Sequence, residues 1–192
     1  MAPENPDHAA ELLTLLSRDH HRSHILDLVH ALHLPDCWIG AGFIRNAVWD
    51  HLHRRPPSKP ASDIDVIWFD PHRARPDDDH AEEQHLTELD PDIRWSVKNQ
   101  CRMHARNDDR PYTSATDALR FWPETATAIA VRRAGETGLE IAAPFGLNDL
   151  FALVLRPTPR FAEAKHDIYL ERVRNKQWRL TWPRLLPATL IP

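Results

Sequence analysis

Two aspartates that stand one residue apart, Asp63 and Asp65, are the residues best suited to chemistry in this chain. Residues 63–69 are mostly apolar around them and predict a β-strand, in which side chains two residues apart point to the same face. Two carboxylates held side by side repel each other unless a cation lies between them. Hard oxygen ligands of this kind suit Mg²⁺, which commonly takes one or two carboxylates together with substrate phosphates. The pair therefore predicts a site for Mg²⁺, with Mn²⁺ as the alternative ion.

A glycine-containing turn, Gly40-Ala41-Gly42, precedes the aspartates in the chain. Glycine is scarce here, with 5 residues against 17 prolines, so two glycines in one turn stand out. Residues 43–53 follow with apolar side chains at helical spacing. Because a glycine turn that enters a helix offers backbone N–H groups to a phosphate, it predicts the phosphate-binding half of such a site.

The elements that must position these residues follow from apolar periodicity and from turn residues. Helices are expected over 9–33 with a break near 17–20, and over 43–53, 77–89, 98–106, 114–122, 147–155 and 162–176. Strands are expected over 63–69, 92–97, 126–132 and 138–143, the last two as a β-hairpin, and residues 37–39 are expected to be a strand or a buried helix entry. This order predicts an α/β or α+β fold with a mixed sheet flanked by helices.

Length and composition predict one compact globular domain of 192 residues, 42% of them hydrophobic. An N-terminal helical segment, 1–36, is expected to pack on a core, 37–155, that a basic extension, 156–192, follows. With no apolar stretch of roughly 18 residues and no signal-peptide pattern, a cytoplasmic protein without a membrane partner is expected. Two cysteines in such a chain are expected to be reduced.

Charge is unevenly distributed along the chain. The net charge is −4, yet residues 151–192 hold eight Lys/Arg against three Asp/Glu. A basic segment of this kind favours contact with a nucleotide triphosphate or a nucleic acid, or forms a solvated face without a partner. The sequence contains no His, Cys and Glu pattern typical of a zinc site, no P-loop and no GxSxG elbow. These absences argue against a zinc enzyme, a P-loop NTPase and a serine hydrolase.

The glycine turn followed by Asp63-Ile64-Asp65 resembles the motif of the DNA polymerase β-like nucleotidyltransferase superfamily. In that superfamily a glycine turn starts a helix, and a strand with two acids follows. Residues 95–104, 122–128 and 143–151 are similar to a bacterial branch known simply as nucleotidyltransferase family proteins. The resemblance covers residues 37–185, which is most of the chain.

The resemblance implies transfer of a nucleoside monophosphate from a nucleoside triphosphate to an acceptor hydroxyl, with release of pyrophosphate. It makes Asp63 and Asp65 the ligands of catalytic metal ions. A third carboxylate is expected on a neighbouring strand between apolar residues, and Glu140 fits best, with Asp92 as a weaker candidate. Ser96 is similarly flanked but cannot serve as a carboxylate ligand, so the third acid is Glu140, Asp92 or absent.

The resemblance also implies a nucleotide-binding set around the glycine turn. Gly40 and Gly42 would let the backbone approach the phosphates. The expected polar contacts are Arg45, Asn46, Ser62, Lys98 and Arg102, and Trp178 near Arg172, Arg174 and Lys176 is a candidate for stacking on a base. For each of these residues a purely structural or solvated role is the alternative.

Two other functions stay open at this point. A nucleotidyltransferase fold that has lost its third acid would be a silent nucleotide-binding or regulatory module. The basic tail, with Arg172 and Arg174, would suit an RNA-binding protein. The sequence names neither the nucleotide nor the oligomeric state, and it leaves the acceptor open between RNA, a protein and a small molecule.

Overall fold

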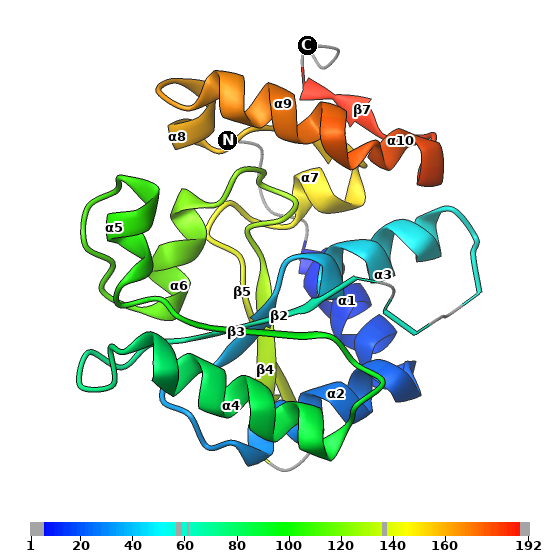
Figure 1. Ribbon diagram of the computed structural model, residues 1–192. Helices are drawn as coiled ribbons and strands as arrows, with labels where there is room; N and C mark the ends of the chain where they lie inside the picture. The colour runs from blue at the N-terminus through cyan, green and yellow to red at the C-terminus, as the bar shows by residue number, and fades with distance from the viewer. Residues whose placement is uncertain (1–5, 57–58, 61, 136–137, 189–192) are drawn as a thin grey trace.

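The computed structural model describes residues 6–56, 59–60, 62–135 and 138–188, and at its centre lies a five-stranded sheet (Figure 1). The strand order is β3-β2-β1-β4-β5. Strands β2 and β3 are parallel, and the other neighbours are antiparallel. The strands are β1 (Trp38–Gly40), β2 (Ile64–Trp68), β3 (Trp95–Asn99), β4 (Ala130–Ala134) and β5 (Gly138–Ala142). The predicted mixed sheet flanked by helices is therefore confirmed.

One face of the sheet is apolar and carries the main core. Register places Ile39 opposite both Val66 and Val131, and Val66 opposite Val97, so these four side chains share that face. Four helices cover it and belong to the same buried cluster. They are α1 (Pro6–Arg18), α2 (His20–Ala31), α3 (Gly42–Leu52) and α4 (Pro76–Leu89).

The opposite face alternates between apolar and polar side chains, as a strand with period two requires. Trp38, Ile67 and Ala130 form a smaller buried cluster there with Ala115 and Leu119. The covering elements are short: α5 (Met103–Asn107), α6 (Ala115–Ala118) and the 3₁₀ turn η1 (Leu119–Phe121). Helices α5 and α6 lie on the other side of the sheet from α1 and α3 (Figure 1). Asp65 also belongs to this face, beyond the end of the small cluster.

The C-terminal part forms a layer across one end of the sheet (Figure 1). Trp178 and Trp182 anchor it by packing edge-on against Trp49 of α3, with ring centroids 5.8 and 5.1 Å away. Trp182 Nε1 also donates to Asp50 at 2.8 Å. Its elements are α7 (Asn148–Phe151), β6 (Val154–Leu155), α8 (Pro159–Ala162), α9 (His166–Lys176), α10 (Trp178–Thr181) and β7 (Leu186–Pro187), with β6 and β7 paired in parallel.

The predicted break in the first helical region lies at Asp19, whose side chain caps α2 by accepting from the backbone N–H of Arg22. Other expected elements differ in detail. Strand β3 extends to Asn99, so Lys98 lies in a strand and not in a helix. The hairpin begins at Ala130, because the N–H groups of Thr127 and Ala128 bond to the carbonyl of Glu124 and make a turn. The helix expected over 147–155 is a single turn followed by β6.

The described part of the chain contains no helix with the length and apolar character needed to cross a membrane. Cys37 and Cys101 are both free thiols.

Candidate nucleotide-binding site

Asp65 lies at the start of β2, and the register of the sheet defines its neighbours. Ser96 of β3 is its partner on one side. On the other side, continuing the antiparallel register places Gly40 of β1 opposite it. Asp63 precedes the strand, with a side chain that is 60% exposed and an Oδ1 that lies 3.1 Å from Arg94 Nε. The two aspartates thus lie at one end of the sheet, two residues apart as the sequence predicts.

The electrostatics of Asp65 fit a cation-binding group. Burial raises the pKa of its carboxyl, and the like charge of Asp63 adds to the rise. Arg45 opposes this rise most strongly, followed by Arg172 and Lys176. Positive charges from both α3 and α9 therefore lie within electrostatic range of one carboxylate.

The donor set fits Mg²⁺ bound together with a triphosphate. Asp63 and Asp65 are two hard oxygen donors that oppose each other's charge, and such a pair is stabilised by a divalent ion. Mg²⁺ completes its octahedral shell with water and substrate phosphates, so two carboxylates suffice for the protein's share.

The glycine turn brings polar side chains to the start of α3. A Cβ on Gly42 would lie 3.0 Å from Ser62 Oγ, 3.4 Å from Asn46 Nδ2 and 3.5 Å from Arg45 Nη2. Ala41 between the glycines has φ 54°, and among the described residues no side chain caps the helix. Four predicted residues therefore converge at a helix N-terminus next to the aspartates. A Cβ on Gly40 would lie 2.7 Å from the ring of Trp122, so only glycine fits beside that ring.

Arg45 lies in the wall of the site and is only 6% exposed. Its guanidinium stacks over Trp178 and Trp49, 4.5 and 5.1 Å from the ring centroids. Nη1 donates to Thr127 Oγ1 at 3.0 Å, while Nε and Nη2 donate to Asn46 Oδ1. Burial lowers the pKa of Arg45 to about 10, against the opposing effect of Glu124. The side chain is therefore still a cation at neutral pH.

Two residues expected at the nucleotide do not join this group. Lys98 is two residues further along β3 than Ser96, and its Nζ donates to Glu83 of α4 at 3.2 Å. Arg102 follows the end of β3 and pairs with the buried Asp79 of α4. Ser96, the partner of Asp65, lies near the start of β3, whereas Arg102 lies three residues beyond the last residue of the strand and therefore past its opposite end.

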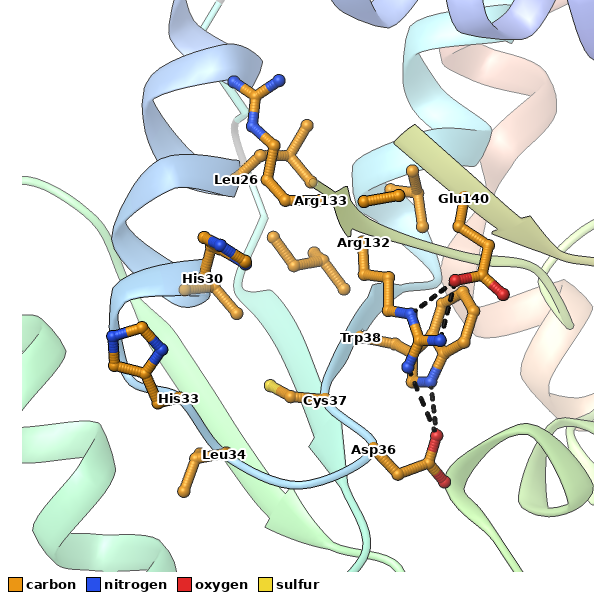
Figure 2. A pocket seen from close by; sticks show the side chains of 14 residues that line it. Leu26, His30, His33, Leu34, Asp36, Cys37, Trp38, Arg132, Arg133 and Glu140 are labelled. Atoms are coloured by element: carbon orange, nitrogen blue, oxygen red, sulfur yellow. Dashed lines mark hydrogen bonds and ion pairs between the residues drawn. The ribbon is translucent and has the colours of Figure 1, made fainter. Parts of the chain in front are cut away.

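Glu140 is not brought together with the aspartates, which corrects the expectation that it completes their metal site. It lies on β5, three strands from β2, and three strand spacings are about 14 Å. Figure 2 shows it paired with Arg132, which also reaches toward Asp36 and stacks over Trp38, in a pocket of about 370 Å³.

Asp92 offers no third ligand from a strand either. It lies in the turn before β3, and its side chain is 81% exposed beside Lys59. Ser96 occupies the position next to Asp65 in the register. Within the described ranges, no three His, Cys, Asp or Glu residues are grouped so that they could hold a metal ion.

The sequence did not predict a role for Glu124, which links the segment before β4 to helix α9. Glu124 is completely buried and accepts a hydrogen bond from Arg172 Nε at 2.8 Å. The signal was an acid within an otherwise uncharged stretch, Trp-Pro-Glu-Thr-Ala-Thr, where a solvated position would not be expected.

The fold and the aspartate pair beside the glycine turn define a domain of the DNA polymerase β-like nucleotidyltransferase class. Residues 27–186 match a protein family described as nucleotidyltransferase, and the chain belongs to that family. A search of curated proteins gave no match.

Solved structures agree with this assignment. The chain is similar to a CCA-adding enzyme head domain solved by NMR, with 33% identity, a TM-score of 0.84 and 97% of each chain covered. A complex of a CCA-adding enzyme with CTP shares the fold, with 14% identity, a TM-score of 0.59, and coverage of 93% of this chain and 42% of that one. The Thermotoga maritima CCA-adding enzyme bound to tRNA matches at 16% identity, a TM-score of 0.52, and 88% and 40% coverage. The chain thus spans about two fifths of those two enzymes.

Proposed function

We propose that this protein is a Mg²⁺-dependent nucleotidyltransferase. It transfers a nucleoside monophosphate from a nucleoside triphosphate to an acceptor hydroxyl and releases pyrophosphate. The observation that carries the proposal is the position of Asp65 near the start of β2, within electrostatic range of Asp63, Arg45, Arg172 and Lys176. An acid pair with converging cations suits a triphosphate that brings its own metal ion.

Asp63 and Asp65 would hold Mg²⁺, which when bound activates the acceptor oxygen and neutralises charge on the phosphates. The start of α3, with Ser62 and Asn46, would bind and orient the triphosphate. Arg45 and Arg172 would stabilise the negative charge that develops as the acceptor oxygen bonds to the α-phosphorus and the bond to pyrophosphate breaks. The relatives solved with CTP and ATP make these two nucleotides the first to test.

Calorimetry with each of the four Mg²⁺–NTPs tests this function directly. Wild-type protein should bind at least one of them, and Asp63→Asn and Asp65→Asn should each weaken that binding. Absence of binding in the wild type, or binding that is indifferent to both substitutions, would refute the proposal.

A second candidate is a nucleotide-binding module without transfer activity. The placement of Ser96, not an acid, beside Asp65 favours it. It predicts Mg²⁺–NTP binding without pyrophosphate release in the presence of RNA, protein or small-molecule acceptors. Pyrophosphate release that Asp65→Asn abolishes would exclude this candidate.

A further inference from the structure

Glu124 is a buried carboxylate held at a fixed place by its backbone. Its segment forms an antiparallel bridge with Pro157, in which Thr125 N donates to the carbonyl of Arg156 and Thr158 N to that of Pro123, each at 3.0 Å. Its own carbonyl accepts from the N–H groups of the following turn. The segment between η1 and β4 is therefore tied to the C-terminal layer.

The side chain of Glu124 reaches a cation on another element. Its exposure is 0%, and Oε1 accepts from Nε of Arg172 on α9 at 2.8 Å. Oε2 is also buried and has no hydrogen-bond partner among the described residues. Because a buried charge is costly unless it is compensated, this carboxylate depends on the positive charges around it.

A second arginine shares this environment. Glu124 is the strongest charge that keeps Arg45 protonated, while Arg172 acts in the opposite sense. Both guanidinium groups stack on Trp178, Arg45 at 4.5 Å and Arg172 at 5.5 Å from the ring centroid. Without a negative charge between them, two like charges on one ring would repel each other.

We propose that Glu124 is a positioning residue of the nucleotide site. Its carboxylate fixes Arg172 and compensates the charge of Arg45, so that both guanidinium groups stay within electrostatic range of Asp65. The inference rests on the proposed nucleotide-binding function and adds to it the residue that organises the two arginines. Glu124 itself is too deeply buried to touch a nucleotide.

The physical benefit is preorganisation. An arginine on a surface helix loses side-chain entropy when it binds a phosphate, and a partner that already holds it in place removes that loss. Arg172 is 30% exposed, so one side of its guanidinium remains accessible while Glu124 occupies Nε. The same contact holds α9 against the segment that follows η1.

The test uses Glu124→Gln, which keeps the shape and removes the charge. We expect about tenfold weaker binding of the Mg²⁺–NTP that binds the wild type best, measured by calorimetry. Arg172→Lys keeps the charge but loses the Nε contact, and it should weaken binding to a similar degree. The loss in the double variant should be smaller than the sum of the two single losses, because both changes remove the Glu124–Arg172 contact. Additive losses, or unchanged binding in both single variants, would overturn the proposal.

Asp109→Asn is the matched control. Asp109 is another completely buried carboxylate that holds basic residues of the same layer, Arg160 at 3.0 Å and Lys165 at 2.9 Å. Its substitution should lower the melting temperature without changing nucleotide affinity. If it weakens binding as much as Glu124→Gln does, general loosening of the layer explains both results and positioning by Glu124 is refuted.

A side-chain NMR measurement separates this inference from the proposed function. In the wild type without nucleotide, the Nε–H signal of Arg172 should exchange slowly with water because it is bonded to Glu124. Glu124→Gln should abolish that protection, and Asp109→Asn should preserve it. If the Arg172 Nε–H is still protected in Glu124→Gln, the positioning role is refuted even if nucleotides bind. If Glu124→Gln loses the protection but the wild type binds no nucleotide, the contact between Glu124 and Arg172 is upheld. The proposed function is then refuted, and so is the positioning role that rests on it.

Discussion

Asp65 on β2 and Glu140 on β5 have the same local sequence pattern but very different surroundings. Each is an acid between apolar residues, Ile64 and Val66 in one case and Leu139 and Ile141 in the other. Register places both on the same face of the same sheet. Local pattern alone would therefore assign them equal roles.

Their positions in the sheet make the difference. Strand β2 lies inside the sheet, and burial together with Asp63 raises the pKa of Asp65. Strand β5 is an edge, and the Glu140 side chain is 48% exposed and paired with Arg132 of the neighbouring strand. Cations of α3 and α9 lie within electrostatic range of Asp65, whereas the charge of Glu140 is exposed to solvent and paired with one arginine. An acid in a strand becomes a candidate site where other elements bring complementary groups to it.

The largest expected contrast is in Mg²⁺–NTP affinity. Asp65→Asn should weaken binding about 100-fold or more, since it removes a charged oxygen ligand. Glu140→Gln should leave the affinity within about twofold of the wild type, because the side chain lies three strands away. Calorimetry on both variants measures the contrast, and comparable losses would show that the two acids act on one site after all.

Adding an acid beside Asp65 sharpens the comparison. Ser96→Asp places a third carboxylate on the neighbouring strand and should tighten Mg²⁺ binding about tenfold, while lowering stability without metal through repulsion. Ala142→Asp is the control. The register of the sheet places Ala142 level with Ser96 and Asp65, but on the edge strand β5, far from the site. Titration with MgCl₂ should separate the two variants. Equal Mg²⁺ affinities would contradict the register argument.

A smaller effect is expected in the pH dependence of stability, which should report the burial of Asp65. The folded-state pKa of Asp65 is raised, so the folded protein holds this proton more tightly than the unfolded chain does. Stability is therefore lost as pH rises from the ordinary pKa of aspartic acid through the raised value. Without metal, Asp65→Asn should melt higher than the wild type at neutral pH, and the difference should vanish in acid. A lower melting temperature for Asp65→Asn at neutral pH would refute this reading.

The smallest expected effect is that of Glu140→Gln on stability. The pair with Arg132 is partly exposed, and pairs of that kind contribute roughly 0–1 kcal/mol. Urea unfolding should therefore give a change below about 1 kcal/mol. A substantially larger loss would show that the pocket around Arg132 depends on this acid.

Elements with strong local signals could be predicted from the sequence. Apolar periodicity located α3 and β2, and the acidic run Asp77–Asp79 indicated the start of α4, which begins one residue earlier. The convergence of Ser62 with Gly42, Arg45 and Asn46 agrees with expectation, because one turn and one strand end hold all four. The predicted bounds of elements were wrong where contacts with distant parts of the chain determine the local structure. Examples are the turn after Glu124 and the extension of β3 to Asn99.

By itself, the sequence determined the acid pair, the glycine turn that precedes it and the class of fold, because side-chain alternation and turn chemistry are local properties of the chain. The tertiary structure decided which acids and cations share a site. It set Glu140 three strands from Asp65, tied Lys98 and Arg102 to α4, and joined Arg172 to Glu124. Strand order and helix docking bring together residues that are distant in the sequence, and the burial that shifts the pKa of Asp65 exists only once those contacts have formed.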